Sequence, residues 1–412
     1  MSYQTLDAHT KTLALWYIVN TSLQSYYKLI ESFGGAEQAL EADVSAWQAL
    51  SLHKAHIGRY QDAQDVLAFV DKVQNDVARG AYGALYQGDA AYPDALDEIY
   101  DPPPVLFYRG NVARLSERQI AIVGSRKPSE YAEKITFDLA QYLVQSGYTI
   151  TSGLAQGVDK SAHLGALAQS AALAGRTVGV AGTGIDVCYP KNHHALFAQI
   201  INDGGCIVSE LLPGTPASKH TFPRRNRLVA GLSLATVVTE AALQSGSLIT
   251  ARLAAEQGKQ VFAVPSRIDN ANAEGCHHLI REGATLIYHP NHIIDEIASA
   301  HTFNALPKTF SQGVSAYGDE GFTATQTKLS SNFDKNTIKN QQVNINSEIS
   351  SVSPQTVPEH LLAVFGCVNQ TAVDLDTLVE MTGLDTGSLL AQLIELEILG
   401  VIAQQGGRYV RL

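Results

Sequence analysis

The sequence predicts an α/β protein built on an extended Rossmann-like, doubly wound parallel sheet, with a small N-terminal helical domain and a C-terminal winged-helix domain. Between residues 119 and 289, short apolar segments such as QIAIVGS, YTITSG and TVGVAG alternate with amphipathic segments of helical length. Strands that alternate with helices form parallel sheets, and such strands are apolar throughout because both sheet faces are covered. Near the C-terminus, three helix-like segments precede a hairpin sequence, which is the order of a winged helix.

The chain divides into four predicted regions. Residues 1–80 carry apolar side chains at three- and four-residue spacing, as in TLALWYIVN, which indicates a helical domain. Residues 81–300 hold the sheet, and PDALDEIYDPPPVLFYRGN, with three prolines followed by a short apolar strand, leads into it as extended chain. We predict a flexible polar linker over 301–355, since 23 of the 47 residues from 309 to 355 are Ser, Thr, Asn or Gln. Residues 356–412 form the winged helix, with its hairpin tip at residues 405–407.

The predicted winged helix is acidic. It holds seven acidic residues against two arginines, and its presumed recognition helix, DTGSLLAQLIELEILG, has no Lys or Arg. Helices that read a duplex groove need cationic partners for the phosphates. We therefore expect this domain to contact protein, or to bind DNA very weakly.

The composition narrows the class of protein further. A formal net charge of −11 argues against a protein that coats nucleic acid with its whole surface, so any nucleic-acid site must be a local basic patch. No apolar run reaches the length of a membrane span, and the N-terminus lacks the pattern of a signal peptide, so we expect a cytoplasmic protein. The four cysteines are widely spaced without a C-x-x-C pair, and we predict neither a metal site nor a cofactor.

Ligands of an open parallel sheet bind at the edge where the carboxyl ends of the strands lie. Nearly every loop after a predicted strand carries Gly with Ser or Thr, as in the GSRK of residues 124–127. Glycine lets backbone amides approach an anion, and helix N-termini favour negative charge. We predict Ser247 as the N-cap of a helix that ends at Gly258. Together the loops indicate a row of phosphate-binding elements, although each alone also suits a tight turn.

The segment KHTFPRRNR, residues 219–227, lies on the same edge. It holds four full positive charges, a histidine and Phe222, with no acidic residue. Lys and Arg neutralise nucleic-acid phosphates, and an aromatic ring stacks on an unpaired base, so a single strand suits this segment better than a duplex. The alternative is a solvated loop whose arginines pair with acidic residues elsewhere.

Six motifs resemble the DNA-processing protein A family, also called DprA or Smf. They are AIVGSRKPSEYAEK, SGLAQGVDKSAHLGAL, GTGIDVCYPKNHHAL, FPRRNRLVAGLS, SGSLITARLAAEQGKQVFAVPS and EGCHHLIREGA. The resemblance covers Tyr92 to Leu286 closely and both ends of the chain more loosely. It implies an extended Rossmann core that binds single-stranded DNA, dimerises, and recruits the recombinase RecA onto DNA during natural transformation of competent bacteria. It implies no enzymatic activity.

The resemblance also implies roles for individual residues. Arg126 and Lys219 would grip phosphates and Phe222 would contact a base, while Arg224 and Arg227 are either further contacts or structural arginines. Glycines and serines of the loops would supply backbone and hydroxyl contacts. The complete predicted DNA-binding set is Gly124, Ser125, Arg126, Lys127, Gly153, Lys219, Phe222, Arg224, Arg227, Ser245, Gly246 and Ser247.

Three positions depart from the family pattern. Ser266 stands where glycine is usual, and His277 stands where asparagine is usual. The N-terminal domain, which resembles SAM and helix-hairpin-helix domains, has Asn-Thr-Ser at residues 20–22 in place of a Gly-x-Gly hairpin. Without those glycines, close approach of backbone amides to a phosphate is disfavoured, so we do not expect this domain to bind DNA on its own.

Two enzyme classes are weaker alternatives. A nicotinamide-dependent dehydrogenase is disfavoured because Val187 stands where the third glycine of the dinucleotide fingerprint belongs, and no P-loop motif is present. An enzyme similar to nucleoside-monophosphate phosphoribohydrolases would use Glu240, with Asp186 as a second candidate carboxylate, but ALQSGSLIT lacks the expected nucleotide loop. Both carboxylates also suit turn and cap positions, and we predict no catalytic residue.

Overall fold

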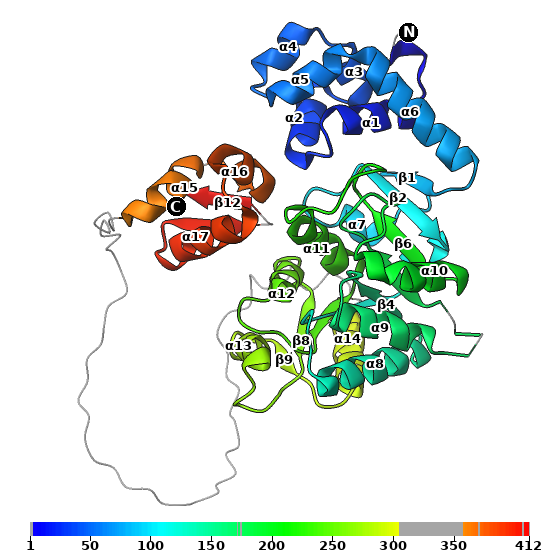
Figure 1. Ribbon diagram of the computed structural model, residues 1–412, viewed down its shortest axis with the longest axis vertical. Coiled ribbons are helices and arrows are strands. Elements are labelled where there is room, and N and C mark those ends of the chain that lie inside the picture. Colours follow the sequence, from blue (N-terminus) through cyan, green and yellow to red (C-terminus); the bar gives the residue numbers. More distant parts are fainter. Residues whose placement is uncertain are drawn as a thin grey trace, which may run out of the picture.

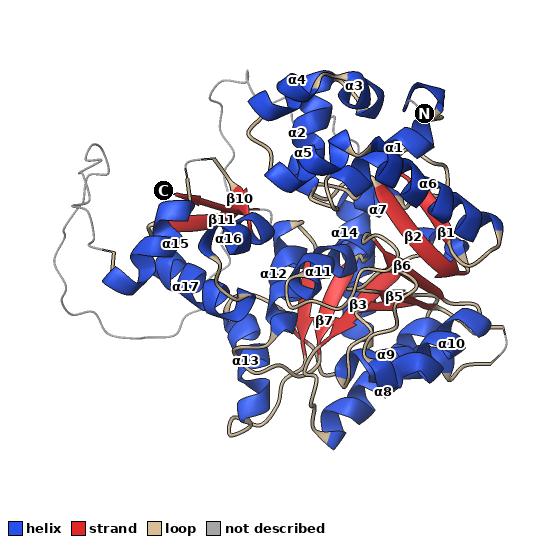
Figure 2. Cartoon of the chain, turned by 45° about the horizontal axis from the view of Figure 1, so that its top comes forward, coloured by secondary structure: helices blue, strands red, loops and turns tan. Residues whose placement is uncertain are grey.

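The computed structural model describes residues 3–170, 172–173, 175–304, 357–369, 371–405 and 408–411. The N-terminal helices lie at one end of the molecule, next to the sheet domain, and the C-terminal domain lies beside both (Figure 1). The sheet domain has helices on both faces of its sheet (Figure 2). This arrangement agrees with the predicted fold class.

Helices fill the N-terminal region. They are α1 (Ala8–Ile18), α2 (Leu23–Phe33), α3 (Ala36–Glu41), α4 (Val44–Ala49), α5 (Lys54–Gln61) and α6 (Ala63–Ala78). Trp16 and Trp47 are completely buried, and the ring of Trp47 stacks on Tyr60 with centroids 4.1 Å apart. The same hydrophobic cluster includes Val105 and Phe107 of the sheet domain, so the helices are packed onto the sheet domain.

The described strands of the sheet domain form one sheet of nine, in the order β1-β2-β6-β5-β4-β3-β7-β8-β9. They are β1 (Gly83–Tyr86), β2 (Val105–Gly110), β3 (Gln119–Val123), β4 (Thr149–Ser152), β5 (Thr177–Val180), β6 (Cys206–Ser209), β7 (Ala235–Val238), β8 (Gln260–Ala263) and β9 (Thr285–Leu286). From β6 to β9 every neighbouring pair is parallel, which confirms the predicted sheet. The antiparallel strands β1 and β2 extend it beyond β6, and β2 is the short apolar strand expected after the three prolines.

Different helices pack against the two faces of the sheet. The helices are α7 (Asp94–Asp97), α8 (Glu130–Gln145), α9 (Val158–Leu167), α10 (His194–Asn202), α11 (Thr221–Leu232), α12 (Gly246–Glu256), α13 (Glu274–Arg281) and α14 (Asn291–Asn304). Ile120 and Ile122 of β3 share a cluster with α8, α9 and α14, whereas Ala121 and Val123 share one with α11, α12 and α13. This alternation follows from the two-residue period of a strand.

The end of α14 corrects one predicted boundary. The helix continues to Asn304, four residues into the range 301–355 that was predicted as linker. The rest of the predicted linker lies outside the described residues.

The centre of the sheet contains a topological switch point. β3 lies between β4 and β7, because the chain first builds the sheet outward from β3 to β6 and then returns to add β7 on the other side. The loops that follow β3 and β7 therefore diverge and leave a crevice at their carboxyl ends. Residues 124–127 and the loop that begins with Glu240 border this crevice.

The C-terminal domain is a winged helix, as predicted. It contains α15 (Leu362–Cys367), β10 (Val373–Asp374), α16 (Leu375–Thr382), α17 (Thr386–Ile398), β11 (Ile402–Gln405) and β12 (Arg408–Arg411). β12 pairs with both β10 and β11, and the domain has a hydrophobic core of its own. Of the predicted hairpin tip, residues 406 and 407 lie outside the described residues.

Phe262 offers a test of this packing. It is completely buried between the sheet and the α8–α9–α14 face, so Phe262→Ala should destabilise the protein by about 3–5 kcal/mol. Urea unfolding followed by circular dichroism measures this. Tyr131→Ala is the control, because that aromatic side chain is 64% exposed and its loss should change stability by less than about 0.5 kcal/mol. Equal effects of the two substitutions would contradict the described core.

Candidate nucleic-acid interface

The basic segment KHTFPRRNR is helical, whereas the sequence was interpreted as a loop. α11 begins at Thr221, directly after Lys219 and His220. Pro223 occupies its third position, where proline is tolerated because the first-turn N–H groups lack a carbonyl partner within the helix. The positive charges therefore lie on the first turns of a helix, where the dipole also favours a negative partner.

Phe222 of α11 belongs to a cluster of aromatic and cationic side chains that also includes residues of two loops. Its ring centroid lies 5.2 Å from that of Tyr189, and the Cζ atom of Arg126 lies 5.7 Å from the Phe222 centroid. Tyr189 is 43% exposed, and Arg126 and Lys127 are exposed as well. A Cβ atom at Gly182 would come within 2.6 Å of the Phe222 ring, so this glycine makes room for the cluster. The cluster presents π-faces and positive charge together to solvent.

The loop after β3 is held from two sides. The Ser125 amide donates to the Glu240 carbonyl at 2.6 Å, and the Val158 amide donates to the Ser125 carbonyl at 3.1 Å. A Cβ atom at Gly124 would lie 2.7 Å from the Glu240 carbonyl oxygen. The Ser125 hydroxyl accepts from the Lys127 amide at 3.1 Å. Gly124 and Ser125 thus fix the position of the loop that carries Arg126.

Arg225 is a site residue that the sequence analysis missed. It is buried, and its Nη1 donates to the Val180 carbonyl at the end of β5. A Cβ atom at Gly153 would lie 2.5 Å from Arg225 Nη2 and 2.7 Å from Asp159 Oδ2. Burial lowers the pKa of Arg225 to about 10, with Asp159 acting in the opposite direction, so the guanidinium stays charged at neutral pH. Gly153 is therefore buried against Arg225, which ties α11 to the loops after β4 and β5.

Tyr189 was missed too, although its sequence context held a signal. It stands in GTGIDVCYP, on a loop that follows a predicted strand, and an aromatic residue at that edge could have been considered beside Phe222. Arg225 gave no comparable signal, because nothing local distinguishes it from the other arginines of FPRRNR.

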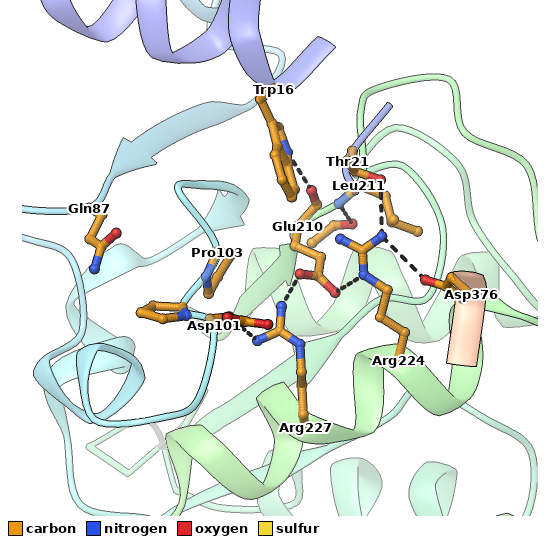
Figure 3. A network of polar contacts seen from close by, with 12 residues as sticks. Trp16, Thr21, Gln87, Asp101, Pro103, Glu210, Leu211, Arg224, Arg227 and Asp376 are labelled. Carbon is orange, nitrogen blue, oxygen red and sulfur yellow. Dashed lines mark hydrogen bonds and ion pairs between the residues drawn. The ribbon is translucent and has the colours of Figure 1, made fainter. Parts of the chain in front are cut away.

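Arg224 and Arg227 converge on one buried carboxylate (Figure 3). Glu210 is 2% exposed; its Oε1 lies 3.0 Å from Arg224 Nε, and its Oε2 pairs with Arg227 Nη2. Arg227 Nη1 also donates to the Asp101 carbonyl at 2.9 Å. Burial disfavours the charge of Arg224, but Glu210 and then Asp376 outweigh it and raise its pKa. Of the two predicted roles for these arginines, the contacts favour the structural one.

The same network joins the N-terminal domain to the sheet. Arg224 Nη1 donates to the Thr21 hydroxyl at 3.2 Å, and Trp16 Nε1 donates to the Glu210 carbonyl at 3.0 Å. Thr21 is buried and has φ of +61°, and Asn20 has φ of +49°, so the turn without glycines still adopts the left-handed conformation. The amides of residues 20–22 donate to carbonyls of residues 16–19, and Arg224 of α11 contacts the turn, so these amides are not free to bind a phosphate.

The serines at the start of α12 correct a predicted cap. The N-cap is Ser245 and not Ser247: the Ser245 hydroxyl accepts from the Ser247 amide, and the two hydroxyls lie 2.6 Å apart. Asn226 Nδ2 donates to the Gly246 carbonyl at 3.3 Å, which joins the starts of α11 and α12. Ser247 lies within the first helical turn, where its hydroxyl remains close to the helix N-terminus.

A cleft of about 1940 Å³ opens between the N-terminal turn, α11, α12 and the winged helix. Ordinary small-molecule pockets measure roughly 300–1,000 Å³, so this cleft is larger than such ligands need. It divides eleven of the twelve predicted residues into two groups, while Ser247, in the first turn of α12, is not one of its lining residues. The cleft group lines it and consists of Lys219, Arg224, Arg227, Ser245 and Gly246. The outer group lies along the loops after β3 and β4 and on α11 and consists of Gly124, Ser125, Arg126, Lys127, Gly153 and Phe222.

The two candidate catalytic carboxylates have structural partners. Glu240 is 2% exposed and accepts from the amide of Ser129 at 2.9 Å and from its hydroxyl at 2.7 Å. Asp186 accepts from the Gly214 amide at 2.6 Å. These contacts match the cap and turn positions that the sequence left open. Nothing in this geometry favours the phosphoribohydrolase alternative.

The two unusual residues of the sheet domain contact each other. His277 Nε2 lies 3.0 Å from the Ser266 carbonyl and 3.3 Å from the Ser266 amide. The Ser266 hydroxyl accepts from Asn270 Nδ2 at 3.0 Å, and the same Nδ2 lies 3.4 Å from Glu240 Oε2. The two departures from the family pattern thus form one local bond network beside the switch point.

Among the described residues, no group of three or more His, Cys, Asp or Glu side chains is arranged to hold a metal ion. The described helices include none with the length and apolar character needed to cross a membrane.

Comparison with known proteins identifies the family. The model of the family described as DNA recombination-mediator protein A matches residues 83–298, and that of the DprA winged helix domain matches residues 350–408. The chain belongs to the DprA family. The first description is of a mediator of DNA recombination, which agrees with the family that the sequence motifs resemble.

Curated relatives and a solved structure agree with this assignment. The chain is 36% identical to protein Smf of Synechocystis sp. over 79% of both chains. It is 45% identical to DNA processing protein DprA of Streptococcus pneumoniae over 48% of this chain and 68% of that protein. The crystal structure of the Streptococcus pneumoniae protein matches 72% of this chain and 99% of its own, with 34% identity and a TM-score of 0.61.

The Glu210 network predicts a large stability effect. Glu210→Gln leaves Arg224 and Arg227 without their shared charge partner, and breaking a buried ion pair by removing one member costs about 3–5 kcal/mol. We expect a loss of that size in urea unfolding. Glu98→Gln is the control, since Glu98 is an exposed glutamate of the same domain. A loss below about 1 kcal/mol would show that the two arginines do not depend on this carboxylate.

Proposed function

We propose that this DprA-family protein binds single-stranded DNA along the carboxyl edge of its sheet. The observation that carries the proposal is the cluster of Phe222, Tyr189 and Arg126, which offers two aromatic rings and a cation at one exposed place. Stacking on such rings requires bases that are unpaired, so a single strand fits and an intact duplex does not. The switch point beside the cluster is where open sheets of this kind bind their ligands.

The residues have different roles in this proposal. Arg126, Lys127 and Lys219 are exposed cations that neutralise phosphates, and Phe222 and Tyr189 stack on bases. Gly124, Ser125 and Gly153 shape the loops, while Ser245, Gly246 and Ser247 bring the N-terminus of α12 to the strand. Arg224 and Arg227 act indirectly by holding α11 in place through Glu210.

The proposed partners extend this function. As a cytoplasmic homodimer, the protein would present bound strands to the recombinase RecA during natural transformation and homologous recombination. A surface for dimerisation is available at β9, the edge strand of the sheet, where Leu286 is 41% and Tyr288 is 81% exposed. An exposed edge strand with apolar side chains favours pairing with another chain.

DNA binding can be measured with fluorescent oligonucleotides across a salt series. Phe222→Ala should weaken single-strand binding by about 1–3 kcal/mol, which is roughly 5- to 150-fold, because one stacked base is lost. Lys219→Ala should lower the slope of log affinity against log salt by about 0.7. Tyr131→Ala, at an exposed aromatic outside the cluster, should change neither quantity. Equal affinity for duplex and single strands, or no effect of Phe222→Ala, would contradict the proposal.

The proposed dimer can be tested through β9. Tyr288→Asp places a charge beside the edge strand, so the mass measured by light scattering should fall from that of a dimer to that of a monomer. Tyr131→Asp makes the same exchange on α8 and should leave the dimer intact. A monomeric wild type would refute dimerisation, and a dimeric Tyr288→Asp variant would place the interface elsewhere.

A further inference from the structure

The winged helix is seated over the cleft group. In both overall views it lies beside α11 and α12 and below the N-terminal helices (Figures 1 and 2). Asp376 Oδ2 of α16 lies 3.8 Å from Arg224 Nη1, and the hydroxyl of Thr386, at the start of α17, is hydrogen-bonded to His220 Nδ1. Both contacts are made to residues of KHTFPRRNR. The winged helix therefore lies against His220 and Arg224, close to Lys219.

The charges of the two surfaces are complementary. The winged helix has seven acidic residues against two arginines, and those nearest to α11 include Asp376 and Asp385. Hydrogen bonds from Ser388 lower the pKa of Asp385, and the positive charge of Lys219 acts in the same direction. A domain without basic residues on its recognition helix thus places carboxylates where the proposed function places phosphates.

Two arginines make further contacts that hold the domain at its wing. Arg408 of β12 pairs with the Asp101 carboxylate, and its Nη1 donates to the Tyr100 hydroxyl at 2.9 Å. Arg252 of α12 donates to Gln404 Oε1 of β11 at 3.0 Å. These contacts fix the orientation of the domain with respect to the sheet.

The docking is polar and therefore reversible. The apolar core of the winged helix forms a cluster of its own that includes no residue of the other domains, so separation breaks no shared hydrophobic core. Desolvation opposes the charged form of Asp376 and raises its pKa to about 6, although Arg224 acts in the opposite direction. Interfaces of this kind between domains open and close readily.

We propose that the winged helix is an internal competitor for single-stranded DNA. Its acidic face occupies the cleft group, while the outer group, with Arg126, Lys127 and Phe222, stays open to a strand. A strand long enough to pass from the outer group into the cleft displaces the domain. This inference rests on the proposed function, because it takes the strand to follow both groups.

Two substitutions undock the domain without adding positive charge. Arg408→Ala breaks the pair with Asp101 and removes a cation. Loss of a positive charge alone would weaken DNA binding, whereas undocking of the winged helix would strengthen DNA binding. Thr386→Ala breaks the bond to His220 and leaves the charge unchanged. The matched control is Glu395→Gln, which removes an acidic charge whose described partner, His360, lies within the winged helix itself.

The experiment measures affinity of the full chain for two oligothymidylates, of about 6 and about 30 nucleotides, which lie near the lower end of and well above the footprint of small single-strand binding modules. For the long strand we expect Arg408→Ala and Thr386→Ala each to bind about two- to fivefold more tightly than wild type, the factor that a contact of a few tenths to one kcal/mol supplies. The short strand should bind all proteins equally, and Glu395→Gln should match wild type. Circular dichroism and thermal unfolding check that each variant is folded.

The outcomes separate the two proposals. If the wild type binds neither strand, the proposed function fails and this inference fails with it. If the wild type binds but both variants bind the long strand no more tightly, the winged helix does not compete and only this inference is overturned. If Glu395→Gln tightens binding as much as the variants do, the effect does not depend on the contacts that dock the domain, and competition is again refuted.

Discussion

The arrangement of the three domains depends on the carboxylate of Glu210. It is buried at the end of β6 and holds Arg224 and Arg227, which lie one helical turn apart on α11. The backbone carbonyl of Glu210 accepts a hydrogen bond from Trp16 of the N-terminal domain. Arg224 links the carboxylate to Asp376 of the winged helix. A charge this buried is tolerable only when it is paired, so the carboxylate and both arginines fix one another's positions.

α11 divides its side chains among several tasks because successive helical residues point about 100° apart. Phe222 faces Tyr189 and Arg126, Arg224 faces the N-terminal turn, and Arg225 passes beneath Gly153. One turn of helix thus connects the proposed base-stacking cluster, the domain junction and the loops after β4 and β5. A shift of α11 would move all three together, which is a physical reason for placing so many contacts on one segment.

Patterns that are local in sequence predicted the fold well. Apolar strands between amphipathic helices gave the parallel sheet, and the C-terminal order of helices and hairpin gave the winged helix. The errors arose where distant residues decide the outcome. KHTFPRRNR was interpreted as a loop because its charges and its proline are also typical of loops. No residue near Arg224 or Arg227 in the sequence indicates that Glu210 is their partner. Ser245 replaced Ser247 as cap because α12 begins two residues earlier than the apolar pattern indicates.

An acidic protein that binds an acidic polymer must keep its cations away from its own carboxylates or accept competition between the two. Glu210 pairs with two arginines of the basic segment, so they are not free to bind phosphates. In the proposed competition, the winged helix places its carboxylates next to the cations that remain in the cleft. A strand that displaces the domain releases counterions from its own phosphates, but the carboxylates that it displaces take up counterions again, so the net release is smaller. Strand binding to the closed protein is then less salt-dependent than its phosphate contacts alone would make it. A long strand gains only the difference between the ion pairs it forms and those it breaks, so strand length becomes a determinant of affinity in its own right.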